Sequence, residues 1–185
     1  MKEKTCCFTG HRNMSLFNLK SILERLSDEI DNLYNQGITN FVLGGAVGFD
    51  YIAATRIIKK RYTCKSIRLI LVLPCKDQDK LWHEEDKALY SFLLESADDI
   101  IYVSDKYYSG CMKKRNYRMV EMSAYCICAL INNRSGTAQT VRRAKQKGLK
   151  IINVAMCGRP VVARTILRSA VDRRSPLQTK YLFSL

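Results

Sequence analysis

Hydrophobic and polar positions follow two patterns along this chain: short apolar runs, and longer segments in which apolar residues recur with helical spacing. Apolar runs of about four to eight residues indicate buried strands, whereas apolar residues repeated every three or four positions indicate amphipathic helices. Segment 15–36 has the helical pattern, and Gly37 follows it as a C-terminal stop. Segment 67–73 is almost continuously apolar and ends at Pro74, which is typical of a strand buried on both faces.

These two patterns alternate over most of the sequence. Strands are expected at 5–9, 39–43, 67–73, 98–104, 125–131 and 149–155. Helices are expected at 15–36, from Gly48 onward, and at 80–96, 113–123 and 137–147. Regular alternation of strand and helix predicts an α/β protein with a Rossmann-like three-layer fold, in which helices flank both faces of a mostly parallel sheet.

The alternation stops after Gly158, where positive charge becomes concentrated. Residues 159–185 contain six Lys or Arg residues and one Asp. We therefore expect a nucleotide-binding domain at 1–158 and a basic C-terminal tail at 159–185 that is partly helical or disordered. The whole chain of 185 residues has a formal charge of +14, which favours anionic partners.

The eight cysteines indicate a reduced protein rather than a disulfide framework or a zinc site. Five of them lie in or beside apolar runs: Cys6, Cys7, Cys126, Cys128 and Cys157. Free cysteine behaves as a small buried hydrophobic residue, and the paired spacing of a zinc site is missing. We expect no metal and no other cofactor. No apolar segment approaches the ~20 residues of a membrane span, so we expect a cytoplasmic protein without membrane contact.

The candidate ligand-binding residues follow strands. Three expected strands end in glycine-bearing turns that lead into helices, at 9–12, 44–50 and 132–137. The candidates in these turns are Thr9, Gly10, His11, Arg12, Gly44, Gly45, Ala46, Gly48, Phe49, Asp50, Asn132, Ser135, Gly136 and Thr137. Glycine lets the backbone approach a phosphate, and a helix N-terminus offers unpaired N–H groups. Because ligands of open α/β sheets bind beyond the carboxyl ends of the strands, we expect one pocket for a small nucleotide-derived ligand at this edge.

Other interpretations of these residues stay open. Tight turns require glycine without any ligand, and both the dinucleotide and the P-loop fingerprints are absent, which disfavours a standard dehydrogenase or P-loop enzyme. Asp50 is either a carboxylate favoured by a helix N-terminus or an acceptor for a ligand hydroxyl or amine. Trp82 either stacks on a base or packs against the core. Arg115 is a candidate ligand residue that could clamp an anion together with Arg118.

In combination, these motifs resemble a known family. The sequences Thr-Gly-His-Arg at 9–12 and Gly-Gly-Ala-x-Gly-Phe-Asp at 44–50, together with Trp82 and 114–116, resemble the YpsA/YspA-type branch of the SLOG superfamily. That superfamily is named for DNA-processing protein A and the LOG ("Lonely guy") proteins. The resemblance extends from about residue 5 to about residue 154. It implies a Rossmann-like fold that binds nucleotide-derived ligands, a role as a sensor or regulatory protein, and a homo-oligomer.

The resemblance to the LOG enzymes raises the question of catalysis. These enzymes hydrolyse the N-glycosidic bond of nucleoside 5′-monophosphates, with the signature Met-x-x-Arg-Lys followed by Pro-Gly-Gly-x-Gly-Thr-x-x-Glu. Here Met112 and Arg115 match the first part, but Asn116 replaces its Lys. Segment 136–137 matches Gly-Thr of the second part, but Thr140 stands at the position of the catalytic Glu.

Three functions therefore remain open. The first is a sensor that binds a nucleotide or nucleotide-derived phosphate ligand. The second is a hydrolase of nucleotides or their conjugates, in which Asp50 or Glu121 would supply the carboxylate that glycosidic cleavage needs. The third is nucleic-acid binding, which the charge of +14 supports. Much of that charge lies in the tail, however, and no interleaving of aromatic and basic residues is recognised along the sequence.

Overall fold

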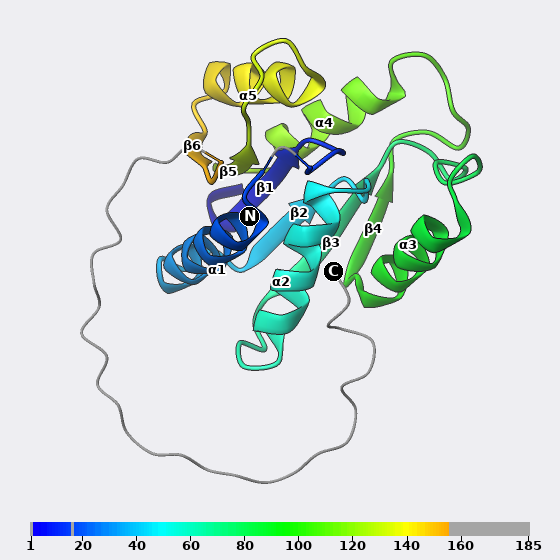
Figure 1. Ribbon diagram of the computed structural model, residues 1–185. Helices are drawn as coiled ribbons and strands as arrows, with labels where there is room; N and C mark the ends of the chain where they lie inside the picture. Colours follow the sequence, from blue (N-terminus) through cyan, green and yellow to red (C-terminus); the bar gives the residue numbers. More distant parts are fainter. Residues whose placement is uncertain (1, 16, 156–185) are drawn as a thin grey trace, which may run out of the picture.

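One six-stranded parallel sheet organises the molecule (Figure 1). The computed structural model describes residues 2–15 and 17–155, so the expected tail at 159–185 and Cys157 lie outside the described residues. The strands are β1 (Thr5–Gly10), β2 (Asn40–Leu43), β3 (Arg68–Leu73), β4 (Asp99–Tyr102), β5 (Tyr125–Ala129) and β6 (Lys150–Asn153). Their order is β4-β3-β2-β1-β5-β6, and every neighbouring pair is parallel. The predicted α/β fold is confirmed.

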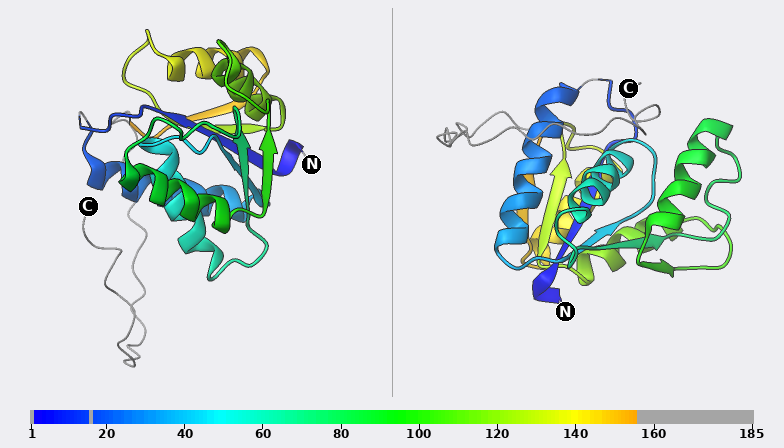
Figure 2. Two further views of the ribbon diagram at one scale, coloured as in Figure 1. Left: turned by 90° about the vertical axis from the view of Figure 1, so that its right-hand side faces the viewer. Right: turned by 90° about the horizontal axis from the view of Figure 1, so that it is seen from below.

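Helices cover both faces of this sheet. In the described part they are α1 (Leu19–Asn35), α2 (Phe49–Arg61), α3 (Glu84–Ser96), α4 (Cys111–Glu121) and α5 (Gly136–Gln146), with a short 3₁₀ helix η1 (Lys2–Lys4) before β1. Helices α1, α2 and α3 lie on one face, and α4 and α5 lie on the other (Figures 1 and 2). The three-layer arrangement therefore matches the one that the alternating pattern predicts.

Two hydrophobic cores hold the layers together, because successive side chains of a strand point to opposite faces. In β1, Cys6 and Phe8 belong to the core beneath α1–α3, whereas Cys7 belongs to the core beneath α4 and α5. All three side chains are fully buried. Burial on both faces explains why the central strands are almost continuously apolar in sequence.

Two helices begin later than the hydrophobic pattern predicts. Helix α1 starts after Asn18, whose side-chain oxygen accepts a hydrogen bond of 3.1 Å from the Ser21 N–H. Helix α3 starts at Glu84 rather than at residue 80, because residues 77–82 form turns. Acidic residues fill the first turn of α3, where the helix dipole favours negative charge.

The seven cysteines of the described segments are free thiols, and all but Cys64 are buried. Cys7 and Cys126 face one another on neighbouring strands. Burial raises the pKa of Cys128 to about 12, which suppresses the reactive thiolate. Among the described residues, no cluster of His, Cys, Asp and Glu suits a metal ion, and no helix there is long and apolar enough to cross a membrane.

Candidate functional site

The turns after β1, β2 and β5 meet around one cavity of about 300 Å³, which we call the three-turn pocket. Its lining comprises Phe8, Thr9, Gly10, His11, Arg12, Ala46, Asp50, Met112, Arg115, Asn116, Met119, Ser135, Gly136 and Thr137. The pocket lies where β1 neighbours β5, and the strand order reverses there. This is the topological switch point at which open α/β sheets bind their ligands.

Gly10 and Gly48 allow the first two turns to interlock. A Cβ atom on Gly10 would overlap the ring of Phe49, and one on Gly48 would overlap the carbonyl oxygen of Arg12. Gly48 also has a φ of +84°, which side-chain-bearing residues rarely adopt. The Phe49 N–H donates a hydrogen bond of 3.1 Å to the His11 carbonyl. Contact between the turns therefore explains both glycines without any ligand.

Gly136 differs from them because it faces open space. A Cβ atom there would have nothing within 4 Å, and its φ is not positive. The preceding Ser135 caps α5, since its hydroxyl oxygen accepts a hydrogen bond of 3.1 Å from the Ala138 N–H. The first N–H groups of a helix have no acceptor inside the helix, and they carry the positive end of its dipole. The start of α5 therefore presents an anion-binding surface to the pocket.

Asp50 and Arg115 form a buried pair beneath the second turn. The Asp50 Oδ2 atom accepts hydrogen bonds from the N–H groups of Gly44 (3.1 Å) and Ala46 (3.4 Å) and lies 3.9 Å from Arg115 Nη1. Arg115 in turn donates a hydrogen bond to the Gly44 carbonyl. Burial raises the pKa of Asp50, and the positive charge of Arg115 opposes that rise. Both charged groups thus hold the 44–50 turn in shape.

Positive charge and unsatisfied polar atoms characterise the rest of the pocket. Arg12 is exposed at the rim, and its charge acts on both Asp50 and Arg115. Two guanidinium groups therefore face one carboxylate. The Nε2 atom of His11 and the Nε atom of Arg115 are buried and have no hydrogen-bond partner among the described residues. Such orphaned atoms are rare in folded proteins and favour a polar ligand.

The two positions that depart from the LOG signature are in direct contact. Asn116 Nδ2 donates a hydrogen bond of 3.0 Å to Thr140 Oγ1, and that hydroxyl donates one of 3.0 Å to the Gly136 carbonyl. Thr140 is 1% exposed, so a neutral, closed pair occupies the place of the catalytic carboxylate. Glu121 lies 3.7 Å from Arg143 and does not line the pocket. Of the two candidate carboxylates, the structure brings only Asp50 to the site.

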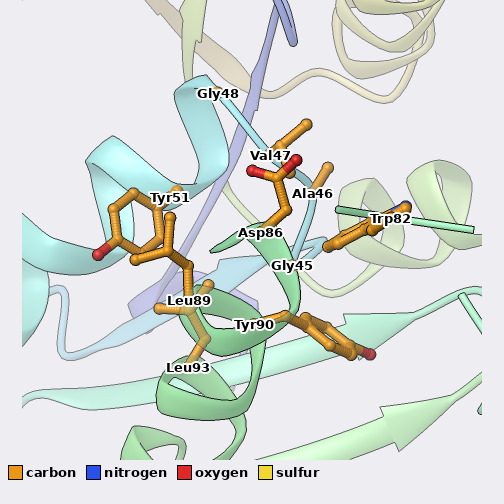
Figure 3. Close-up of a pocket in the computed structure, with 10 residues that line it drawn as sticks. All are labelled: Gly45, Ala46, Val47, Gly48, Tyr51, Trp82, Asp86, Leu89, Tyr90 and Leu93. Carbon is orange, nitrogen blue, oxygen red and sulfur yellow. The ribbon is translucent and has the colours of Figure 1, made fainter. Parts of the chain in front are cut away.

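Trp82 lies at a different cavity, of about 50 Å³, on the other side of the second turn. Figure 3 shows Trp82 and Tyr90 on one side of it and Tyr51 on the other. The Trp82 ring meets the Tyr90 ring edge-on, with centroids 5.3 Å apart. Gly45 lines this small cavity rather than the three-turn pocket. These contacts favour the second interpretation of Trp82, in which its ring packs against the hydrophobic core.

Some expected site residues do not reach the pocket. Asn132 stabilises its own turn, because its Oδ1 atom accepts a hydrogen bond of 2.8 Å from the Arg134 N–H. The predicted clamp of Arg115 with Arg118 is wrong. Arg115 is 6% exposed and turns toward the sheet, whereas Arg118 is exposed and lines another groove.

Sequence reasoning missed two residues that shape the site. Gln78 is buried, and its Nε2 atom donates a hydrogen bond of 2.8 Å to the Gly45 carbonyl, which supports the second turn. Met119 lines the pocket from α4. Gln78 lies in a polar stretch with no recognisable motif. The position of Met119, four residues after Arg115 on the same helix face, is the signal that could have identified it.

Known proteins are similar to this chain in sequence and in fold. The YspA SLOG family profile matches residues 6–154. An SPbeta prophage-derived protein, YoqJ, of Bacillus subtilis is 32% identical over 149 residues, which cover 73% of this chain and 85% of that protein. A UPF0398 protein of Halalkalibacterium halodurans is 26% identical over 116 residues, which cover 62% of this chain and 60% of that protein.

Two solved structures share the fold. DNA processing protein A of Streptococcus pneumoniae has a TM-score of 0.62 at 19% identity, over 87% of this chain and 53% of that one. DNA processing protein A of Helicobacter pylori has a TM-score of 0.58 at 18% identity, over 80% of this chain and 63% of that one. The chain thus spans less than two thirds of both. The family match covers the strands and helices that build the three-turn pocket, and the chain belongs to the YspA SLOG family.

Proposed function

We propose that the three-turn pocket binds the phosphate group of a nucleotide or nucleotide-derived ligand and that the protein acts as a sensor or regulator through this binding. The observation that carries this proposal is the open N-terminus of α5 at the pocket, where Gly136 leaves free space beside unpaired N–H groups. The cavity volume of about 300 Å³ lies at the lower end of the range for small-molecule sites.

The surroundings of α5 support a phosphate at this place. Arg12 lies at the rim and would add a charge-assisted hydrogen bond to the anion. A second cavity of about 250 Å³, between α4 and α5, shares Met112, Asn116 and Gly136 with the pocket. The sugar and base of a nucleotide would extend into this adjoining space.

Binding is favoured over hydrolysis of an N-glycosidic bond. Thr140 and Asn116 form a neutral hydrogen-bonded pair at the positions where the LOG signature has Glu and Lys. Asp50 already accepts two backbone hydrogen bonds and lies beside Arg115. No carboxylate is therefore left poised to stabilise an oxocarbenium-like centre in this pocket, as far as the described residues show.

Single-stranded nucleic acid is the second candidate ligand. The Helicobacter pylori neighbour is described as having a single-stranded DNA binding mode, and the present chain has a formal charge of +14. We further propose a cytoplasmic homo-oligomer in which 1–158 form the binding domain and 159–185 form a basic tail. Multi-angle light scattering of the full chain would test the oligomer.

Calorimetry with a panel of nucleoside monophosphates, cyclic nucleotides and ADP-ribose tests the proposal. We expect at least one of them to bind, and we expect Gly136→Ala to weaken that binding about tenfold or more, because the added methyl group occupies the anion site. The variant's melting temperature provides the control, since the structure has room for this methyl group. Absence of binding across the panel at millimolar concentration would refute the proposal. Release of free base that disappears in Asp50→Ala would favour the hydrolase.

A further inference from the structure

A second concave surface lies beside α4, at the edge of the sheet formed by β4. This groove has a volume of about 690 Å³, and we call it the α4 groove. Its lining comprises Ile101, Tyr102, Val103, Gly110, Lys113, Lys114, Tyr117, Arg118 and Glu121. In the described part of the chain, β4 is an edge strand with β3 as its one strand neighbour (Figure 1).

The rim of the α4 groove is positively charged. Lys113, Lys114 and Arg118 are exposed, and none of them forms an ion pair with another described residue. The one acidic residue of the groove, Glu121, lies 3.7 Å from Arg143, which offsets its charge. Three uncompensated cations along one helix favour an extended polyanion.

Tyrosines accompany these cations. Tyr102 is 39% exposed in the groove, and Tyr107 and Tyr108 are exposed on the loop that leads from β4 to α4. Tyr117 lies near two cations, with Lys113 Nζ 5.6 Å and the Arg143 guanidinium 5.0 Å from its ring centroid. Aromatic and basic residues therefore interleave in this segment, although no such pattern is recognised in the sequence alone. These residues lie at 102–118, and the structure shows that most of their side chains are exposed together on one part of the surface.

We propose that the α4 groove binds single-stranded nucleic acid, with phosphates on Lys113, Lys114 and Arg118 and a base stacked on Tyr102. Cations that follow a backbone, combined with exposed aromatic rings, are the two components of such surfaces. This inference rests on the second candidate of the proposed function and gives it a site, which is separate from the three-turn pocket and does not require that pocket to be occupied. An acidic peptide strand fits less well, because β4 has only four residues to offer for backbone pairing.

The groove and the pocket are continuous along the surface. The cavity between α4 and α5 shares Gly110, Lys113 and Tyr117 with the α4 groove. The same cavity shares Met112, Asn116 and Gly136 with the three-turn pocket. A strand held in the groove could therefore place one of its ends at the start of α5.

Fluorescence anisotropy with a labelled oligothymidylate of about 12 nucleotides tests the groove. The variant is Lys113→Gln/Lys114→Gln/Arg118→Gln. Its matched control is Lys20→Gln/Lys59→Gln/Lys65→Gln, which removes the same charge from exposed positions on α1 and near the end of α2. We expect the groove variant to bind the oligothymidylate about tenfold or more weakly. The slope of log K against log salt should also become shallower by about 2, because each of the three lost phosphate contacts accounts for ~0.7 of that slope. The control variant should keep the affinity and the salt dependence of the wild type.

A second pair of variants tests stacking without a change of charge. Tyr102→Leu should weaken binding of the oligothymidylate about fivefold or more, because the contact with a base is lost. Tyr62→Leu is the control and should not weaken binding, since Tyr62 is 74% exposed near the end of α2 and lies outside the groove. Equal losses in a groove variant and its control would overturn the proposal. Equally tight binding of a duplex or of polyglutamate would overturn it as well, and so would an oligomer that the groove variants dissociate in sedimentation. Mononucleotide calorimetry on the same variants reports separately on the pocket.

Discussion

Gly10 and Gly136 both stand at a strand–helix turn, yet a methyl group added to each would meet different surroundings. At Gly10 it would overlap the Phe49 ring, and at Gly136 it would meet open space. Turn glycines in this sequence look alike, but only the structure separates those that let two turns interlock from the one that leaves room for a ligand. The pocket therefore depends on Gly10 for the contact between two turns and on Gly136 for free space at the start of α5.

This difference predicts opposite effects on stability. Gly10→Ala should lower the free energy of unfolding by about 1–3 kcal/mol, because the overlap with Phe49 forces the two turns apart. Gly136→Ala should leave it unchanged or raise it by up to about 1 kcal/mol, because alanine is the better helix former. Urea denaturation of both variants measures these values. Equal destabilisation by the two would contradict the assignment of Gly136 to open space.

Asp50 gives a prediction for pH. Because burial raises its pKa above the ordinary value of 3.8, the folded protein holds this proton more tightly than the unfolded chain does. The contribution of Asp50 to stability is therefore fully present below about pH 3.8 and declines as the pH rises through the raised value. The wild type should lose stability relative to Asp50→Asn over that window. Urea denaturation of both proteins at a series of pH values measures this loss. A wild type that gains stability relative to Asp50→Asn as the pH rises would show that the charge of Arg115 affects the pKa of Asp50 more than burial does.

At the scale of elements, the sequence predicts well what depends on local pattern. Apolar runs locate all six strands. The four central strands are buried on both faces, whereas the edge strands β4 and β6 are partly exposed. The three glycine-bearing turns follow from the ends of β1, β2 and β5. The contact of Gln78 with Gly45 depends instead on how distant segments meet. Arg115 combines both kinds of signal. Its spacing of four residues from Cys111 and Met119 places it on the buried face of α4. Only the structure shows its contacts with Asp50 and Gly44.

Helix α5 links stability to ligand binding through its cap. Ser135→Ala removes the acceptor for the Ala138 N–H, so it should cost about 0.5–2 kcal/mol of stability and weaken nucleotide binding as the first turn frays. Ser135→Asp keeps a capping oxygen but adds negative charge beside the anion site. It should retain stability and still lose affinity. Urea denaturation and calorimetry separate the two effects, and an aspartate variant that binds as well as the wild type would argue against a phosphate at α5.

At the scale of the whole molecule, the residues that the structure describes form one sheet with a separate core on each face, and cysteine thiols lie in both cores. Cys6 lies in the core beneath α1–α3, whereas Cys7, Cys126 and Cys128 lie beneath α4 and α5. If the two cores unfold together, these four thiols lose their protection at the same rate, set by global unfolding. If α4 and α5 separate first, the three thiols of their core become reactive while Cys6 stays protected.

We expect the first outcome, because the four strands that carry or flank these thiols, β2, β1, β5 and β6, share one continuous ladder of hydrogen bonds. Buried thiols with raised pKa values do not react in the folded state, so N-ethylmaleimide should label Cys64, which is half-buried, well before Cys6 or Cys128. Mass spectrometry of peptides after timed labelling in low urea gives a rate for each site. Faster labelling of Cys128 than of Cys6 would show that the α4–α5 layer opens on its own, and the three-turn pocket, which is built across both layers, would then open with it.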